Sequence, residues 1–312
     1  MKASHLESSS KSLKFGEFLT HPDTKELLLL TSPTIRKANA SLLKRRGLGF
    51  INAMVKMKVQ VLGSFWLPGL HIYSASSLKS MSSFTGLSQK KMLVATTHEN
   101  IELDNWYSLK GDPFMIVENK WETLEEYAAS MKKKYRARFK KARLLKKELE
   151  FKGITSHADL QKCCELLADT LESKVVALPA DLSALLTGFK EWFGDDYQVI
   201  GALSKGEIIG FIAFIKTHNA LRAMHYGAIE DAPDGLYSAL MYEVIHNGIL
   251  LGVKEINLGR TATEIKSTYG AVPRDNYFSF HTKNPLMKLA LSIAKKRYKP
   301  KEYILRSPFQ LD

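Results

Sequence analysis

Two basic side chains follow the end of a predicted strand, where they could bind a negatively charged group. The segment INLGRTATEIKSTYGAVP, residues 256–273, begins with alternating apolar residues, reaches a glycine, and then carries Arg260 and Lys266. Ligands of α/β proteins often bind beyond the carboxyl ends of strands, and an arginine can hold a carboxylate or phosphate through two parallel hydrogen bonds. We therefore expect Arg260 and Lys266 to bind such a group on a substrate. The competing interpretation is a structural ion pair with Glu255 or Glu264.

The elements that would position these residues are three strands, a helix and a fourth strand. Residues 196–204, 205–217 and 219–229 have the alternation of strands and are separated by turn residues, which predicts an antiparallel meander. The apolar pattern that starts near Gly235 predicts a helix, and a strand parallel to the third follows it. Residues 197–282 are therefore expected to form one mixed sheet that this helix crosses.

The start of this helix is a second candidate anion site. The preceding loop, EDAPDG at 230–235, is short, and the first N–H groups of a helix have no partner within the helix. Gly235, Leu236 and Tyr237 are therefore candidate donor-binding residues. A strand, loop and helix of this kind is common in proteins and is by itself weak evidence for an anion site. The nearby segment with Arg260 and Lys266 strengthens the prediction.

A strongly basic helix is predicted over residues 122–150. Thr123 and Glu126 have the spacing of a capping box, and ten of the sixteen residues 132–147 are basic. Since no acid lies within that run, the helix repels itself unless an anion is near. The candidate anion-facing residues are Lys133, Arg136, Lys140 and Arg143. The competing interpretation is a solvated helix face.

Composition favours acidic partners and an intracellular setting. The net charge of +13 fits nucleic acid, nucleotide phosphates or anionic lipid. The two cysteines are adjacent, at 163 and 164, so they indicate neither a disulfide scaffold nor a metal site. The N-terminus lacks the apolar stretch of a secretory signal, and charges interrupt the apolar segment 50–70. We expect a soluble, cytoplasmic chain without a transmembrane segment, and the inner face of the membrane is one place where it could act.

The pattern changes near residue 120, where we expect a domain boundary. Residues 1–120 combine strand-like runs with many turn residues and would form a strand-rich N-terminal lobe. Residues 121–312 would form the second domain, which begins with the basic helix.

The order of the elements resembles the GNAT acyltransferase fold, and the sequence of the segments is more similar to its FemAB-like and CelD-like branch. There, a basic helix similar to YAASMKKKYRARFKKA precedes the meander, and a stretch similar to HYGAIEDAPDGLYSALMYEVIHNGILLGVKEINLGRTATEIKSTYGAVP follows it. That stretch ends with a lysine before an aromatic-Gly-Ala sequence, here Lys266 and Tyr269. The resemblance covers residues 115–285 and implies an α/β (α+β) fold: a GNAT-like mixed sheet with flanking helices, and a degenerate GNAT-like lobe at 1–120. The implied activity is that of a peptidoglycan-bridge-type or related N-acyltransferase.

One departure from the GNAT pattern concerns the acyl donor. Enzymes that use acetyl-CoA usually have a glycine-rich, arginine-bearing cradle for the pyrophosphate, whereas EDAPDG has three acids and one glycine. The resemblance implies no bound cofactor, acyl-CoA or aminoacyl-tRNA as co-substrate, and an amine as acceptor. The acidic loop favours the larger donor, so tRNA is a further candidate partner. A peripheral membrane surface is another, which the basic helix would contact.

Acyl transfer to an amine needs a polarised carbonyl and a proton donor for the leaving group. Tyr226 could supply that proton, and His225 or Glu230 could accept one from the amine. Because neighbours on a strand face opposite sides, His225 and Tyr226 cannot line one cleft. We therefore assign the catalytic roles to Tyr226 and Arg260, and add Tyr269 to the donor-binding residues.

A function from another class fits the same features. The chain could be a non-catalytic protein of this fold that holds RNA or an anionic surface through its basic helix. A cleft lined by Tyr226, Arg260 and Lys266 would favour the enzyme, and a cleft filled by side chains would favour the binder.

Overall fold

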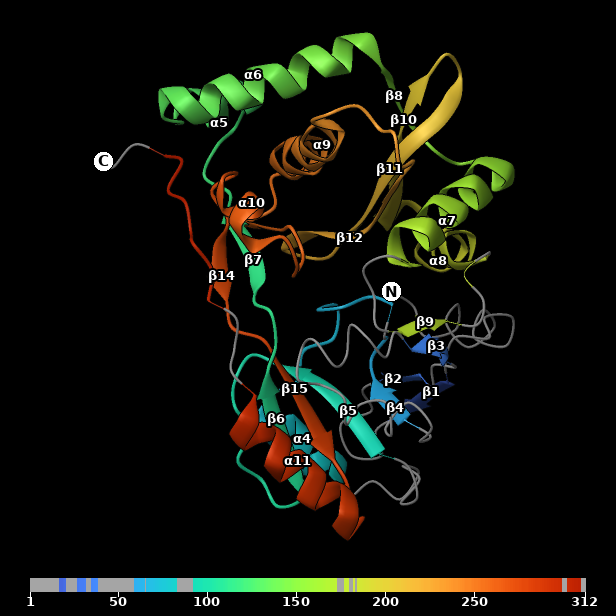
Figure 1. Ribbon diagram of the computed structural model, residues 1–312, viewed down its shortest axis with the longest axis vertical. Helices are drawn as coiled ribbons and strands as arrows, with labels where there is room; N and C mark the ends of the chain where they lie inside the picture. Colours follow the sequence, from blue (N-terminus) through green and yellow to red (C-terminus); the bar gives the residue numbers. More distant parts are fainter. Residues whose placement is uncertain are drawn as a thin grey trace. The chain divides into compact units, whose positions relative to one another are not determined.

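The computed structural model describes residues 17–20, 27–31, 35–38, 59–64, 66–82, 92–172, 177–179, 182, 184–298 and 302–309. These residues form two compact units, and the chain passes from one to the other more than once (Figure 1). Unit 1 comprises the described residues within 1–112, 175–180 and 275–301. Unit 2 comprises those within 113–174, 181–274 and 302–312.

Unit 2 is built on a mixed sheet whose strand order is β14-β7-β13-β12-β11-β10-β8. The strands are β7 (Phe114–Glu118), β8 (Glu150–Gly153), β10 (Tyr197–Ser204), β11 (Glu207–Lys216), β12 (Ala220–Ala228), β13 (Glu255–Asn257) and β14 (Val272–Arg274). β10, β11 and β12 form the predicted meander, and β13 is parallel to β12. The near-continuous apolar sequence of β11, which is buried from residue 208 to residue 215, fits a strand that is covered on both faces.

Helices cover both faces of this sheet (Figure 1). On one face lie α5 (Leu124–Ala129), α6 (Lys133–Glu148) and α9 (Leu236–Leu250), and α10 (Thr263–Ser267) follows β13. On the other lie α7 (His157–Glu172) and α8 (Leu185–Phe193). α7 packs so closely on β12 that a Cβ at Gly227 would come within 2.7 Å of the backbone of Leu166. Glycine is therefore required there for the close approach.

Unit 1 has a six-stranded sheet in the order β1-β2-β4-β5-β15-β6 and a separate pair, β3-β9. The strands are β1 (Glu17–Thr20), β2 (Leu27–Thr31), β3 (Ile35–Ala38), β4 (Val59–Leu62), β5 (Met92–Thr97), β6 (Trp106–Lys110), β9 (Ala177–Pro179) and β15 (Tyr277–His281). Its helices are α4 (Ala75–Ser82) and α11 (Pro285–Arg297). Thr97, Ser108 and Ser279 share buried hydrogen bonds of 2.8–3.1 Å across β5, β15 and β6.

The predicted sheet over 197–282 is correct as far as β14 and wrong for its last strand. β15 lies between β5 and β6 in unit 1, because the buried Ser279 and its neighbours pair with those strands. The units also differ from the predicted domains 1–120 and 121–312. β7 pairs with β13 and β14, so unit 2 begins at residue 113, and residues 275–301 lie in unit 1.

The predicted helix over 122–150 is broken into α5 and α6. The capping box is present, since the Glu126 N–H donates to Thr123 Oγ1 at 3.1 Å. The break follows Ser130: the Lys132 N–H donates to the Pro308 carbonyl at 2.8 Å, and Met131 forms an isolated bridge with Phe309. A strand-like contact with the C-terminal segment thus replaces the helical hydrogen bonds there.

Candidate active site

The parallel strands β12 and β13 pair over only three residues and then diverge. Ala220–Arg222 pair with Glu255–Asn257, but β12 continues to Ala228. Beyond Asn257 the chain follows β7 instead: the Leu258 N–H donates to the Met115 carbonyl at 2.8 Å. The parallel pair that the sequence predicted is therefore present, but the rest of β12 has no β13 ladder beside it.

A β-bulge lies on β12 at the start of this divergence. Ala213 pairs with His225 and Phe214 pairs with Ala223, so Met224 is an extra residue on β12. Bulges increase the local twist and redirect side chains, and they are frequent beside active sites.

His225 and Tyr226 lie on opposite faces of the sheet, as their alternation predicted. His225 is buried, its Nδ1 lies 3.0 Å from the Tyr197 hydroxyl, and its ring stacks on Phe189 of α8. Tyr226 faces α9, and its half-buried ring meets Tyr237 edge to face at 5.0 Å. His225 therefore has a structural environment, while Tyr226 lies beside the start of α9.

Tyr226 belongs to a tyrosine cluster that also contains Tyr237, Tyr242 and Tyr269. The Tyr242 and Tyr269 rings are 5.0 Å apart, and the Tyr269 hydroxyl lies 2.8 Å from the Ser238 Oγ. Tyr269 is 2% exposed, and its carbonyl accepts a hydrogen bond from the buried Tyr127 hydroxyl at 2.9 Å. Two of the predicted donor-binding residues, Tyr237 and Tyr269, and the predicted catalytic Tyr226 therefore converge.

Burial sets the protonation state of this cluster. It raises the pKa of Tyr226, Tyr237 and Tyr242, because a phenolate loses its hydration there. Burial also raises the pKa of Tyr269 to about 12, although the hydrogen bond with Ser238 and the charge of Arg138 partly oppose it. All four phenols are thus protonated near neutral pH, so they can donate hydrogen bonds but cannot act as bases.

Lys266 and Arg260 are both beside the end of β13, with different environments. Lys266 is 3% exposed, and its Nζ donates to the Arg260 carbonyl at 3.2 Å. This contact stabilises the turn that Gly259 forms at φ 83°. Arg260 is half-buried, with its guanidinium 5.8 Å from the centre of the Phe114 ring. Of the two, Arg260 is the more accessible to a ligand.

The suggested ion-pair partners of these two residues also have contacts elsewhere. Glu255 accepts two hydrogen bonds from Arg274, at 2.7 and 2.9 Å, and this bidentate pair links β13 to β14. Glu264 Oε1 accepts a hydrogen bond from the Ile304 N–H at 3.3 Å.

The start of α9 differs from the expected anion site. Gly235 has the left-handed φ of 95° and is exposed, which suits its position before the helix. The Leu236 N–H, expected to be available to a ligand, donates to the Pro233 carbonyl at 3.0 Å, and the Leu236 side chain is buried. The acids Glu230, Asp231 and Asp234 are exposed beside it. The loop therefore suits a pyrophosphate poorly.

The four candidates on α6 divide into two kinds. Lys133 and Lys140 are exposed. Arg136 Nη2 donates to the Met131 carbonyl at 2.8 Å, and Arg143 pairs with Glu125 at 3.0 Å. The acid that pairs with Arg143 thus comes from α5 and not from α6 itself.

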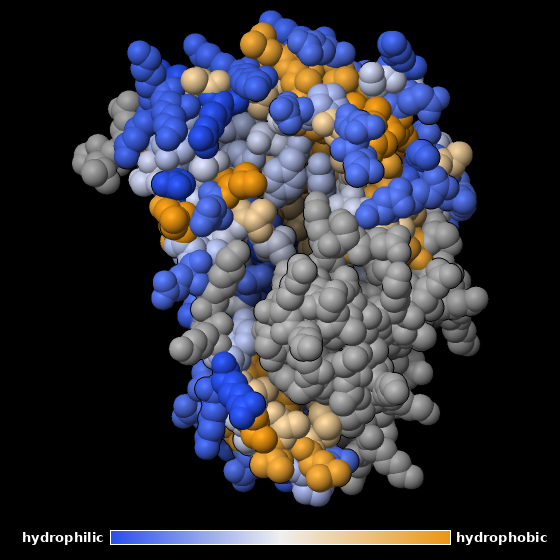
Figure 2. Space-filling model, viewed as in Figure 1, coloured by the Kyte–Doolittle hydropathy of each residue, from blue (hydrophilic) through white to orange (hydrophobic). Residues whose placement is uncertain are grey.

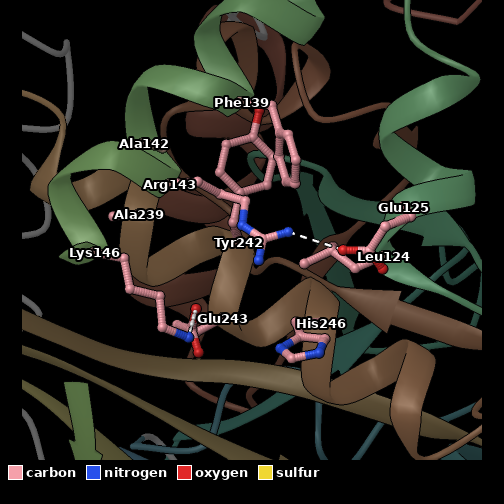
Figure 3. Close-up of a pocket in the computed structure, with 10 residues that line it drawn as sticks. All are labelled: Leu124, Glu125, Phe139, Ala142, Arg143, Lys146, Ala239, Tyr242, Glu243 and His246. Atoms are coloured by element: carbon pink, nitrogen blue, oxygen red, sulfur yellow. Dashed lines mark hydrogen bonds and ion pairs between the residues drawn. The ribbon is translucent and has the colours of Figure 1, made fainter.

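A small cavity between α5, α6 and α9 contains two such pairs (Figure 3). The Arg143–Glu125 pair lies at one side, and Lys146 donates to Glu243 at 2.7 Å at the other. Its volume is about 60 Å³, well below the several hundred Å³ of typical ligand pockets. We interpret it as a packing defect between helices that ion pairs close.

A larger groove, of about 240 Å³, lies between α6, α10 and the segment 302–309. Its basic residues are Lys134, Arg138 and Arg306, against one acid, Glu264. Thr268, which lines the groove, directly precedes Tyr269, and the charge of Arg138 opposes the rise in the pKa of Tyr269 and Tyr242, so the groove adjoins the tyrosine cluster. Tyr226, Arg260 and Lys266 line neither this groove nor the small cavity. Neither of the two is therefore the cleft that would have favoured the enzyme.

Sequence reasoning missed Ser238, Arg138 and Arg306. Ser238 follows Tyr237 at the start of α9, and its spacing to Tyr269 has no local signal because 31 residues separate them. Arg138 was within the basic run, but only the fold shows that it adjoins Tyr269. Arg306 is placed by its N–H, which donates to Ser267 Oγ at 2.9 Å.

The parts of the chain that can be described were also compared with the requirements of a metal site and of a membrane-spanning helix. Within those ranges no three His, Cys, Asp or Glu side chains gather as a metal ligand set. None of the helices there has the length and hydrophobicity that crossing a bilayer requires. Cys163 and Cys164 are both buried in α7.

The meander, the crossover helix α9 and the diverging parallel strands define a GNAT-like fold. No protein-family model and no curated protein sequence matches the chain. Among solved structures, L-PGS from Bacillus licheniformis is similar, with 12% identity, a TM-score of 0.56, and coverage of 96% of this chain and 98% of that one. FemX is similar with 11% identity and a TM-score of 0.54, over 91% of this chain and 93% of its own.

A third similar structure is the C-terminal DUF2156 domain attributed to a lysylphosphatidylglycerol synthetase of Agrobacterium fabrum. It has 9% identity and a TM-score of 0.53, over 94% of this chain and 96% of that one. The resemblance to GNAT-like and FemAB-like proteins is therefore confirmed at the level of the fold.

Proposed function

We propose that the chain is an N-acyltransferase that moves an acyl or aminoacyl group from an ester or thioester donor to an amine. The observation that carries this proposal is the convergence of Tyr226, Tyr237 and Tyr269 beside the divergence of β12 and β13. Protonated phenols in a poorly hydrated site are suited to stabilise charge that develops on oxygen during acyl transfer.

The chemistry assigns separate roles to these groups. The amine nitrogen attacks the acyl carbonyl, whose oxygen becomes negatively charged and accepts hydrogen bonds from β12 N–H groups and a phenol. Collapse of this intermediate breaks the bond to the donor oxygen or sulfur, and Tyr226 gives that atom a proton. Because the phenols are protonated near neutral pH and cannot act as bases, the amine loses its proton to solvent or to an exposed acid such as Glu230. Tyr226 then regains a proton from solvent, so the transfer involves no net gain or loss of protons.

Aminoacyl-tRNA is the donor that the surroundings favour. The acidic loop before α9 suits a pyrophosphate poorly, whereas the groove of Lys134, Arg138 and Arg306 adjoins the tyrosine cluster and suits a phosphate backbone. The names of the similar structures, which include a lysylphosphatidylglycerol synthetase and FemX, support an aminoacyl group and a role in the cell envelope.

The test is transfer of a radiolabelled group by the full chain. Labelled aminoacyl-tRNAs and acyl-CoAs are incubated with the protein and amine-bearing acceptors, including a lysine-containing peptide. Tyr269→Phe should reduce turnover strongly, whereas Tyr197→Phe should not, although both remove a buried phenolic hydroxyl. Tyr197 is the matched control because it bonds to His225 on the other face of the sheet. Equal effects of the two substitutions would place the chemistry elsewhere.

No transfer from any donor, combined with tight RNA binding, would favour the alternative function. The chain would then be a non-catalytic protein of the same fold that holds RNA through α6.

A further inference from the structure

Helix α11 has apolar side chains on two faces, and among the described residues only one of these faces is covered. Met287, Leu291 and Ala294 point to the sheet of unit 1, where Leu291 is fully buried against Met92. Leu286 is 76% exposed, Leu289 61% and Ile293 43%. A helix that is apolar on both sides normally has both sides buried.

The three exposed residues form one stripe. A helix turns by about 100° per residue, so positions 286, 289 and 293 fall on one side, about 130° around the axis from 287, 291 and 294. We call Leu286, Leu289 and Ile293 the apolar stripe. Figure 2 shows hydrophobic surface beside hydrophilic surface in the part of unit 1 where Figure 1 places α11.

The charged residues of α11 and of the chain on either side of it have a single sign. No aspartate or glutamate occurs from residue 276 to 301, and the basic residues within α11 and just before it are Lys283, Lys288, Lys295, Lys296 and Arg297. Lys295, Lys296 and Arg297 are exposed and form the last turn of α11. Long basic side chains beside an apolar stripe can place their stems on hydrocarbon and their charges among phosphates.

We propose that α11 docks on the surface of a membrane that contains anionic lipids. The apolar stripe enters the boundary between head groups and acyl chains, and the basic last turn contacts lipid phosphates. A basic amphipathic helix with leucine and isoleucine on one face is typical of helices that lie in the plane of a membrane interface. A second copy of the chain fits less well, because two stripes flanked only by positive charge would repel each other. The proposal does not depend on the transferase activity.

The charge complementarity predicts both a lipid preference and its magnitude. Each lysine or arginine near an anionic surface strengthens binding by about fivefold. Lys296→Ser with Arg297→Ser, the two basic residues that flank the apolar stripe on the helix, should therefore weaken binding by about 25-fold on anionic vesicles and little on neutral ones. Leu286→Ser with Leu289→Ser should weaken binding to anionic vesicles by on the order of tenfold per residue.

The experiment is co-sedimentation of the full chain with phosphatidylcholine vesicles, with and without phosphatidylglycerol. Leu144→Ser and the pair Lys140→Ser with Lys141→Ser are the matched controls, since Leu144 is 56% exposed and both lysines are exposed on the other basic helix, α6. Circular dichroism verifies that each variant is folded, which is expected because every substituted side chain is exposed.

Binding that needs phosphatidylglycerol, and that only the α11 variants lose, would support the proposal. Equal losses in the α6 variants would overturn the assignment to α11. Absence of binding to any vesicle would overturn the proposal, and sedimentation velocity would then ask whether the stripe joins two copies. Transfer activity with soluble acceptors should be the same in all α11 variants, so failure here and failure of the proposed transferase can be distinguished.

Discussion

The exposed charge on α6 distinguishes the two classes of acyl donor. Lys133 and Lys140 lie two helical turns apart, about 10 Å along the axis, and therefore face the same side. Arg136 and Arg143 are less suitable for a test, because the first donates to Met131 and the second pairs with Glu125. The informative perturbation is therefore Lys133→Glu together with Lys140→Glu.

The magnitude follows from counterion release. A polyanion that docks on α6 loses condensed cations, and each phosphate contact adds about 0.7–0.9 to the slope of log affinity against log salt. If each lysine makes one contact, the double variant should lower that slope by about 1.4–1.8. An acyl-CoA carries few charges, so its slope should be shallow and nearly unchanged.

The assay is fluorescence anisotropy of a labelled tRNA over a salt series. The matched control is Lys216→Glu with Lys254→Glu, which makes the same change in net charge at exposed positions on β11 and before β13. If the control and the α6 variant lowered the slope of log affinity against log salt by the same amount, the effect would be one of general charge without docking on α6. A slope that neither variant changes would remove aminoacyl-tRNA as the donor on this helix.

Three further predictions concern the candidate site and its support. Arg260→Ala should weaken donor binding or transition-state binding by about 1.5–3 kcal/mol, the contribution of a charge-assisted hydrogen bond, and should leave the melting temperature nearly unchanged. A large fall in melting temperature with normal donor binding would show that Arg260 has a structural role. Since burial raises the pKa of Tyr269 from 10.0 to about 12, the folded state holds the phenolic proton more tightly than the unfolded chain. This contribution to the free energy of unfolding is complete below the unfolded pKa and is lost as pH rises through the folded pKa. Tyr269→Phe should therefore flatten the decline of the melting temperature at alkaline pH. A decline equal to that of the unsubstituted chain would contradict the burial argument. Gly206 and Gly270 both have φ of 86°, but a Cβ meets nothing within 4 Å at Gly206 and overlaps the Phe309 ring at Gly270. Gly206→Ala should therefore cost about 1–2 kcal/mol in chemical denaturation and Gly270→Ala clearly more, unless Phe309 moves aside without cost.

The sequence was most informative where structure follows from local pattern. The meander β10–β12 and the helix α9 have clear periodicity and turn residues, and the strand that follows α9 is parallel to β12. The opposite orientation of His225 and Tyr226 followed from strand alternation alone. The capping box of Thr123 and Glu126 was also readable, because it depends on residues three positions apart.

The features that could not be predicted depend on contacts distant in sequence. The break between α5 and α6 depends on Pro308 and Phe309, which lie far along the chain and have no local signature at residue 131. Lys266 lies at a strand end that suggested anion binding, yet its ammonium bonds to the Arg260 carbonyl. The partner of β15 was missed for a similar reason, since a short strand does not encode which sheet it joins.

The position of β15 determines when unit 1 can be completed as the chain is made. β5 and β6 do not pair with each other in the finished sheet; β15 lies between them, and its residue Tyr277 is opposite Thr97, 180 positions earlier. The ribosome must therefore synthesise every strand of the unit 2 sheet before β15, the last strand of the six-stranded sheet in unit 1, exists. Two unpaired strand edges stay available for misassociation during that interval. The N-terminal strands therefore cannot complete their sheet first, as the N-terminal part of a protein usually does. They can do so only after residues 277–281 have been synthesised.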